Sequence, residues 1–278
     1  TVSLASGSGT LGGTLSALTA GGVATFTNLA ITGPTGAYTL QFASTGLTSV
    51  TSTTIGIGAG VATQLAMVTQ PSTSAVNGVA FAVQPAVQVR DAAGNPVAGV
   101  RAVTASIATG GGTLGGTLTV NTDAAGLATF TNLAITGTVG PRTLRFTSGT
   151  LSQALSGSVT TTAGAATQIA VNAGNGQSAT VNTAVAVPPS VVVRDVSGNP
   201  VSGVSVTFAV ASGGGSIVPV TPATTNASGI AAIEAVPAQA LHDRAQPGLC
   251  LAGSLQVCFC GFGFAAALVE YARQVLRD

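Results

Sequence analysis

The ten residues ATFTNLAITG occur twice without a difference, at Ala24–Gly33 and at Ala128–Gly137, and the two copies lie 104 positions apart. A run of this length does not recur by chance, so the chain contains an internal repeat of about a hundred residues. The repeat predicts the architecture of the chain. It predicts neither a ligand nor a reaction.

The repeat extends on both sides of this stretch. TLGGTL at Thr10–Leu15 recurs at Thr113–Leu118, and VQVRDAAGNPVAGV at Val87–Val100 is matched by VVVRDVSGNPVSGV at Val191–Val204. The register divides the chain into the C-terminal part of a first repeat (1–61), a complete repeat (62–165), the N-terminal part of a third repeat (166–235) and a divergent tail (236–278). Because the first residue already lies inside a repeat, we expect the chain to be an excerpt of a longer protein.

The composition favours a packed β protein. Charged residues make up 5% of the chain and hydrophobic residues 46%, whereas a disordered chain would be poorer in apolar residues. The net charge is +1 and the arginines are scattered, so nucleic acid is not an expected partner. All three cysteines lie in the tail, and disulfide bonds are therefore not expected to hold the repeats together.

Alternating apolar and polar residues predict short β-strands. Val87 and Val89 are expected on one side of a strand, with Gln88 and Arg90 on the other. The same alternation predicts inward rows at Leu40 and Phe42, at Leu144 and Phe146, and at Val204, Val206, Phe208 and Val210. Turns rich in Gly, Pro and Asp separate the strands. Each repeat is therefore predicted to be an antiparallel, two-sheet β-sandwich of immunoglobulin type, with Phe130 in its core.

A spaced motif links the chain to a known family. The segment D-x-x-G-N-P-V-x-G-V, followed by a strand, a glycine run and a G-[LIV]-A turn, resembles the bacterial immunoglobulin-like repeats of the invasin and intimin group. The matching positions in this chain begin at Asp91 and Asp195, continue at Gly110–Gly112 and Gly213–Gly215, and end at Gly126 and Gly229. The resemblance covers residues 1–235 and implies tandem modules of an extracellular bacterial adhesin. The receptor-binding tip and the membrane barrel of invasins have no counterpart in the sequence, so only the stalk is implied.

The aspartates of this motif are the candidates for a metal site. Asp91 and Asp195 could bind Ca²⁺ together with nearby carbonyl groups, because Ca²⁺ prefers oxygen ligands. In the alternative interpretation, each carboxylate accepts backbone N–H groups in a turn that Asn95–Pro96 shapes. One carboxylate per repeat is few for an ion that takes about six to eight oxygens, so the structural interpretation is favoured and no metal ligand is predicted. Arg90 and Arg194 are expected to face solvent.

No catalytic site and no cofactor are predicted. The single histidine, His242, is adjacent to Asp243, and neighbouring side chains seldom form a nucleophile-activating pair. The chain has seven Asp and Glu residues in all, which makes a pair of catalytic carboxylates hard to assemble. Gly110–Gly116 lacks the Lys and the following helix of a phosphate-binding loop. Because the chain contains no Lys, a Lys–Asn isopeptide crosslink is excluded within it.

The tail differs from the repeats, and three interpretations of it remain open. Residues 249–269 carry no charge and are long enough to cross a bilayer as a helix, with Arg273 and Arg277 on the cytoplasmic side. Alternatively, Leu255–Phe264 continues the third repeat as a strand and Ala265–Arg277 forms a short amphipathic helix. The third interpretation, which we favour, is a change of reading frame, so that the tail is not the native continuation.

The three cysteines of the tail do not indicate a metal site. Their positions, Cys250, Cys258 and Cys260, match no standard zinc-site spacing, and a fourth ligand would have to be His242. No metal is therefore predicted in the tail.

The expected function is structural. We expect a non-enzymatic stalk or spacer of a large bacterial cell-surface or secreted adhesin-like protein, with the neighbouring modules of the same chain as its partners. A membrane is expected as a partner only if the tail is an anchor. One alternative is a module that binds glycan or protein, although Tyr38 is the only Tyr of the repeats and is replaced by Arg142 in the next copy. The other alternative is an accessory region of a secreted hydrolase.

Overall fold

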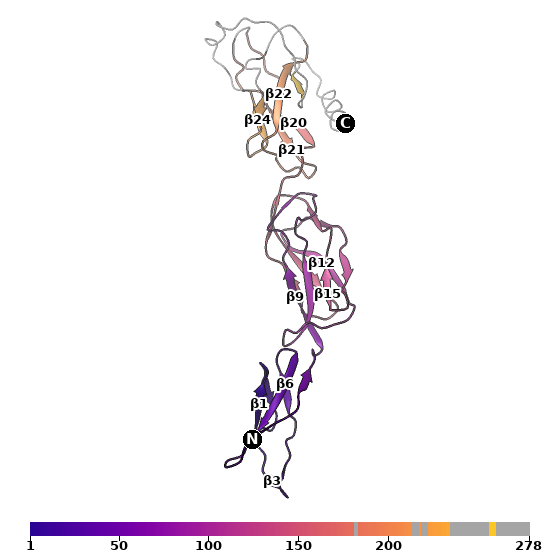
Figure 1. Ribbon diagram of the computed structural model, residues 1–278. Coiled ribbons are helices and arrows are strands. Elements are labelled where there is room, and N and C mark those ends of the chain that lie inside the picture. The colour runs from indigo at the N-terminus through magenta and orange to yellow at the C-terminus, as the bar shows by residue number, and fades with distance from the viewer. Residues whose placement is uncertain (181–182, 213–216, 218–221, 234–255, 260–278) are drawn as a thin grey trace. The chain divides into compact units, whose positions relative to one another are not determined.

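The computed structural model describes residues 1–180, 183–212, 217, 222–233 and 256–259. Within these ranges the regular structure consists of β-strands, which confirms the predicted all-β class (Figure 1). The chain divides into two compact units, one formed by Thr1–Ser74, Ala80–Ala134 and Pro141–Val159, the other by Ala75–Val79, Ile135–Gly140 and Thr160–Asp278. Each unit therefore joins residues of two successive repeats.

Residues 1–61 form short strands around one longer strand. The strands are β1 (Val2–Ser6), β2 (Thr10–Gly12), β3 (Thr19–Ala20), β4 (Val23–Ala24), β5 (Ala30–Thr32), β6 (Gly36–Phe42), β7 (Val50–Thr51) and β8 (Ile55–Ile57). Strand β6 pairs antiparallel with β1, β7 and β8. Strand β2 pairs with β5, and β3 pairs with β4.

The complete repeat carries strands on two main sheets. Its strands are β9 (Ala62–Thr69), β10 (Ser74–Val76), β11 (Ala86–Asp91), β12 (Ala102–Thr109), β13 (Thr113–Gly115), β14 (Thr119–Asn121), β15 (Leu127–Thr129), β16 (Ala134–Thr136), β17 (Gly140–Thr147), β18 (Ala154–Leu155) and β19 (Val159–Thr162). One sheet has the order β15-β11-β9. The other has the order β10-β19-β17-β12-β14, with β18 also paired to β17. Strands β13 and β16 form a separate pair.

The core of this repeat lies between the two sheets. Phe130, directly after β15, packs against Phe146 of β17 with ring centroids 5.3 Å apart. Val87, Val89 and Leu144 are completely buried, as the alternation predicts. These contacts confirm the predicted core positions and give a sandwich-like arrangement, in which a buried apolar side chain contributes roughly 1.5–3 kcal/mol.

The polar side of β11 is buried as well. Gln88 lies on the face opposite Val87 and Val89 but is 8% exposed, and its side chain reaches the turn at Ala125. Its Nε2 donates a hydrogen bond to the carbonyl oxygen of Ala125 at 2.8 Å, which compensates the loss of water. The alternation therefore predicts the apolar face correctly but not the burial of the polar one.

The apolar side chains of the repeated ten-residue stretch are buried in one copy and partly exposed in the other. In the complete repeat, Phe130, Leu133 and Ile135 are at most 1% exposed. Their counterparts Phe26, Leu29 and Ile31 are partly exposed. The difference arises because β9 and β11, which complete the core of the middle repeat, have no counterpart in residues 1–61, where β4 pairs with β3 instead. Burial here depends on the covering strands and not on the local sequence.

Residues 166–233 form the start of a further sandwich-like layer pair. The strands are β20 (Gln168–Ala173), β21 (Ser190–Arg194), β22 (Ser205–Val210), β23 (Ala223–Thr224) and β24 (Ile230–Ala232), ordered as β20-β21-β24 in one sheet, with β23 paired to β22 in the other.

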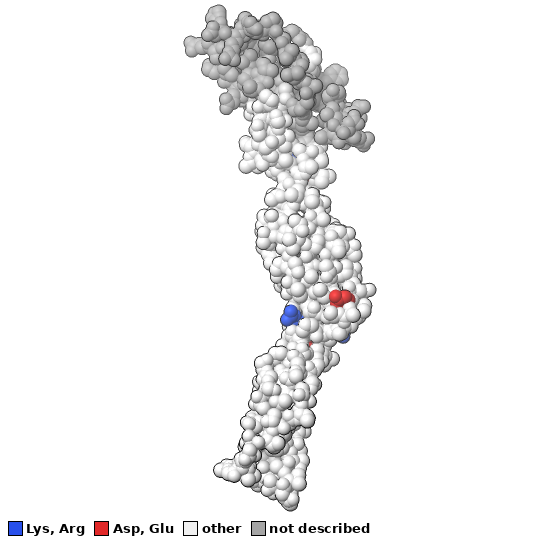
Figure 2. Space-filling view, viewed as in Figure 1, with Lys and Arg blue, Asp and Glu red and all other residues white. Residues whose placement is uncertain are grey.

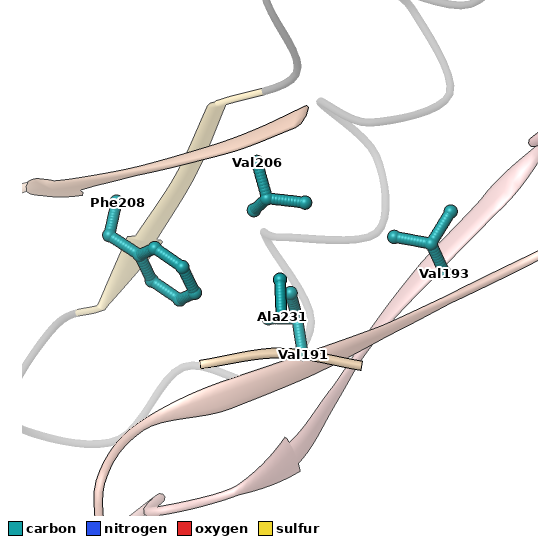
Figure 3. Packing of buried hydrophobic residues seen from close by; sticks show 5 residues of the cluster. All are labelled: Val191, Val193, Val206, Phe208 and Ala231. Atoms are coloured by element: carbon teal, nitrogen blue, oxygen red, sulfur yellow. The ribbon is translucent and has the colours of Figure 1, made fainter. Parts of the chain in front are cut away.

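The core of this third part lies between β22 and the sheet that contains β21. Figure 3 shows Val206 and Phe208 of β22 facing Val191, Val193 and Ala231. The predicted inward row does not extend to Val210, which is 39% exposed at the end of β22. The inward orientation predicted for Val206 and Phe208, at the centre of this row, is confirmed.

Little of the tail is described. Residues Gln256–Phe259 form β25, which pairs in parallel with β22. These four residues lie inside the candidate membrane segment 249–269 and inside the alternative strand 255–264, and the remaining residues of both segments lie outside the described ranges. Among the described residues, no helix has the length and apolar character needed to cross a membrane.

Candidate functional site

The D-x-x-G-N-P segment forms a tight turn at the end of β11. The backbone N–H of Asp91 donates to the carbonyl of Asn95 (3.0 Å), and the N–H of Gly94 donates to the carbonyl of Asp91 (3.1 Å). Gly94 has φ = 85°, a left-handed conformation that glycine adopts without strain. Arg90 and Pro96 then form an antiparallel bridge that sends the chain back along β11.

The same turn follows β21 in the third repeat. The N–H of Asp195 donates to the carbonyl of Asn199 (2.9 Å), and the N–H of Gly198 donates to the carbonyl of Asp195 (3.0 Å). Gly198 has φ = 81°. The local sequence therefore fixes one backbone shape at both positions, although the two middle residues of the turn differ.

The Asp91 carboxylate holds the turn and the segment that precedes β9. Its Oδ1 accepts the backbone N–H of Asn95 (2.8 Å). Its Oδ2 accepts the Nδ2 group of Asn95 (2.9 Å) and the backbone N–H of Gly60 (2.8 Å). Gly60 belongs to the connection between the first and the middle repeat, so this buried carboxylate ties that connection to the turn.

The Asn95 carboxamide contacts the preceding repeat directly. Its Nδ2 donates to the carbonyl of Gly33 (3.0 Å), and its Oδ1 accepts the backbone N–H of Thr35 (2.9 Å). Gly33 is the last residue of the repeated ten-residue stretch. Asn95 is buried, and all five residues of this network lie in the same compact unit. The turn of one repeat is thus hydrogen-bonded to the end loop of the repeat before it.

An equivalent network is present at the next junction. Nδ2 of Asn199 donates to the carbonyl of Gly137 (2.8 Å), and its Oδ1 accepts the N–H of Val139 (3.0 Å). Oδ2 of Asp195 accepts the N–H of Gly164 (2.9 Å) and Nδ2 of Asn199 (2.9 Å). Each participant lies 104 positions after its counterpart in the first network, and all belong to the second compact unit.

The second network contains one more side chain. Asn77 of the middle repeat donates from Nδ2 to Oδ2 of Asp195 (2.8 Å) and to Oγ of Ser197 (2.9 Å). Its Oδ1 accepts the backbone N–H of Gly137 (2.9 Å). Asn77 is 6% exposed, so both ends of its carboxamide are used in a nearly dry environment.

Both carboxylates are ionised at neutral pH. The side-chain hydrogen bond from Asn95 and the backbone N–H of Gly60 lower the pKa of Asp91 to about 2. Burial alone would raise the pKa of Asp195, but the bonds from Asn199, Gly164 and Asn77 outweigh it and lower the pKa to about 2. Hydrogen bonds to the charged form therefore dominate at both positions.

The networks favour the structural interpretation of these aspartates over a Ca²⁺ site. The two oxygens of Asp195 accept five N–H groups, from Ser197, from the backbone and side chain of Asn199, from Gly164 and from Asn77. A carboxylate offers about four lone-pair positions, so none remains for a cation. In the described part of the chain, no three Asp, Glu, His or Cys residues gather as metal ligands.

The arginines before the turns do more than face solvent. The NH1 group of Arg90 donates to the carbonyl of Gly94 (3.0 Å), and that of Arg194 donates to the carbonyl of Gly198 (2.8 Å). Arg194 is exposed as predicted, whereas Arg90 is partly buried. The face drawn in Figure 2 carries few charged side chains, so these guanidinium groups are local supports of the turn and not part of a basic patch.

The other candidate residues do not assemble into a site in the described structure. Tyr38 is 2% exposed and its hydroxyl donates to the carbonyl of Pro34 (2.7 Å), so it offers no aromatic platform for a glycan. Gly110–Gly112 connects β12 to β13, as a strand connection should. Positions 242, 243, 250 and 260, which hold the His, the adjacent Asp and two of the Cys residues, lie outside the described residues, and Cys258 lies in β25.

The sequence did not reveal the partners of the turn. Gly33, Thr35, Gly60 and Asn77 were not predicted to contribute. Three of them recur at the repeat distance, as Gly137, Val139 and Gly164, and that constant register was the available signal. For Thr35 and Val139 the residue type changes, because the bond uses the backbone N–H alone.

No family model matches this chain, and no curated protein matches it either. Its function therefore has to be argued from its own contacts.

Proposed function

We propose that this chain is a non-enzymatic spacer: tandem immunoglobulin-like repeats that project or link other domains of a large bacterial cell-surface or secreted protein. The observation that carries the proposal is the pair of hydrogen-bond networks centred on Asp91 and Asp195, which join successive repeats through the same residues in the same register. Buried polar groups that join one repeat to the next suit a protein that projects or links other domains.

The use of the carboxylates supports a non-enzymatic role. Within the described residues the chain has three, Asp91, Asp123 and Asp195. Oδ1 of Asp123 accepts the backbone N–H groups of Ala125 and Leu127, both at 2.9 Å. All three accept backbone N–H groups in turns, which supports a structural use of these carboxylates.

The family resemblance supports the proposed location. The D-x-x-G-N-P turn, on which the likeness to invasin and intimin repeats rests, is the element that contacts the preceding repeat. The neighbouring modules of the same chain are thus the proposed partners, and the bacterial surface or the extracellular medium is the proposed location.

Small-angle X-ray scattering on variants of different length tests the proposal. We would insert one or two additional copies of residues 62–165 after position 165 and measure the maximum dimension of each protein. A spacer gains a constant increment for each copy. A maximum dimension that stays nearly constant as copies are added would show that the repeats collapse on one another and would refute the spacer.

A further inference from the structure

We infer that the D-x-x-G-N-P turn couples the folding of each repeat to the folding of the repeat before it, so that successive repeats do not fold independently. This inference rests on the proposed serial arrangement and adds the energetic link between neighbours. The compact units already point to it: the second unit takes Ala75–Val79 and Ile135–Gly140 from the middle repeat and joins them to the third.

The contact between the repeats pairs a side chain of one repeat with backbone groups of the other. The carboxamide of Asn95 donates to one backbone group of the preceding loop and accepts from another two residues later, Gly33 and Thr35. A carboxamide has the same donor and acceptor as a peptide group, so it pairs with that loop as a neighbouring strand would. The contact fixes which end of the carboxamide faces which backbone group, but it involves none of the side chains of the loop. Accordingly, Pro34 and Thr35 in one junction are replaced by Thr138 and Val139 in the other.

The Asn95 carboxamide has a fixed orientation. If Asn95 were rotated by 180°, its oxygen would face the Asp91 carboxylate and its NH₂ group would face the N–H of Thr35. Both contacts would be repulsive. Oδ2 of Asp91, 2.9 Å from Nδ2, therefore selects the orientation that matches the preceding repeat. The aspartate positions the asparagine, and the asparagine makes the contact.

The Asp and Asn side chains of both turns are buried. Asp91 and Asn95 are 4% and 7% exposed, and Asp195 and Asn199 are 0% and 4% exposed. Polar groups that have lost water depend on their protein partners, and losing one partner leaves the other unsatisfied. If the preceding repeat opens, the carboxamide loses both bonds to it. Opening one repeat must therefore also destabilise the next repeat, whose carboxamide is left without partners.

The second junction contains one more side chain whose loss tests the coupling. It contains the same bonds as the first and, in addition, the carboxamide of Asn77, which reaches Asp195 and Ser197 from the middle repeat. Asn77 is a second buried side chain that depends on both repeats. Its loss should weaken this junction without any change to the D-x-x-G-N-P turn itself.

Hydrogen exchange measured by mass spectrometry on the full chain tests the coupling. In Asn95→Ala, we expect the amides of residues 38–42 in β6 to exchange about fivefold faster or more, the change that corresponds to one unsatisfied buried group. Asn95 makes no contact with β6 in the described network, so a change there reports transmission through the junction. Asn95→Asp, which keeps the size and one acceptor but loses the donor, should give the same direction of change if the Ala variant folds poorly.

Asn132→Ala is the matched control. Oδ1 of Asn132 accepts the backbone N–H of Thr117 (2.8 Å) inside the middle repeat. Its loss should accelerate exchange near residues 115–119 and leave residues 38–42 as they are in the unmodified chain. If Asn95→Ala accelerates only the amides of Thr35 and Gly60, the repeats fold independently and the inference is wrong. The spacer would survive that result as a string of independent modules, whereas a failure of the scattering test would remove the spacer whatever the exchange data show.

Discussion

Phe130 and Phe26 occupy the same position in two identical ten-residue stretches, yet Phe130 is 1% exposed whereas Phe26 is only partly buried. Each packs against the matching phenylalanine of its own repeat, Phe146 or Phe42, with ring centroids 5.3 and 5.5 Å apart. The pair is therefore local to the repeat. What differs is the covering strands: β9 and β11 complete the core of the middle repeat, and residues 1–61 contain no counterpart of them.

This relationship predicts unequal costs for the same substitution. Phe130→Ala should lower the free energy of unfolding of the middle repeat by about 3–5 kcal/mol, because it opens a cavity in a closed core. Phe26→Ala should cost about half of that or less, since solvent already reaches the site. Urea unfolding followed by circular dichroism measures both values. Equal losses would mean that the first repeat is as well covered as the second.

Gly94 should not tolerate a side chain. At φ = 85° an alanine is in the left-handed region, so Gly94→Ala should cost about 1–2 kcal/mol, although no atom stands in the way of a Cβ. Gly115→Ala is the control, because its φ is not positive and a Cβ would meet only the carbonyl oxygen of Ala134 at 3.9 Å. Thermal unfolding compares the two. A neutral Gly94→Ala would contradict the turn geometry described above.

Acid should weaken the junctions. The pKa of Asp91 and of Asp195 falls from the ordinary value of 3.8 to about 2 in the folded chain. A lowered pKa gives stability that is fully present above about pH 4 and is lost as the pH falls towards 2. We expect the free energy of unfolding to drop across that range.

The contribution of one junction can be isolated with Asp195→Asn. This variant should lose stability at pH 7, because an amide NH₂ group faces N–H donors where the carboxylate accepted them. Its stability should then depend less on pH between 4 and 2 than that of the unmodified chain. Unfolding curves at several pH values give both slopes, and identical slopes would show that Asp195 does not titrate in this window.

Arg142 fills the position that Tyr38 occupies in the first repeat. It is 2% exposed, and its Nε donates to the carbonyl of Gly111 (3.0 Å). Arg142→Tyr should fold with a free energy of unfolding within about 1 kcal/mol of the unmodified chain, because Tyr38 is equally buried at the corresponding position of the first repeat. Arg142→Ala should cost about 2–4 kcal/mol by leaving a cavity. Chemical denaturation of the two variants checks the order, and a Tyr variant weaker than the Ala variant would contradict it.

The apolar alternation was enough to predict the core strands. Val87, Val89, Leu144 and Phe146 are all completely buried, because a strand places alternate residues on one face whatever its neighbours are. The burial of Gln88 could not be read in this way. Its side chain bonds to the carbonyl of Ala125, 37 positions further along the chain, and the local alternation cannot predict such a contact.

The candidate site was predictable only in part. The spacing of Asp91 and Asn95 predicts a turn in which the carboxylate accepts backbone N–H groups, and the structure has those bonds. The bond from Asn95 to Gly33 joins residues 62 positions apart. No local pattern predicts such a contact, because it depends on how one repeat follows the next. The repeat distance alone could have suggested it, through the identical spacing of Gly137 and Asn199.

Since Asn95 and Asn199 pair with peptide groups of the preceding loop, a newly duplicated repeat would fit its neighbours without any compensating substitution. If the chain is the proposed spacer, its length can therefore change by whole repeats while every junction keeps the same hydrogen bonds.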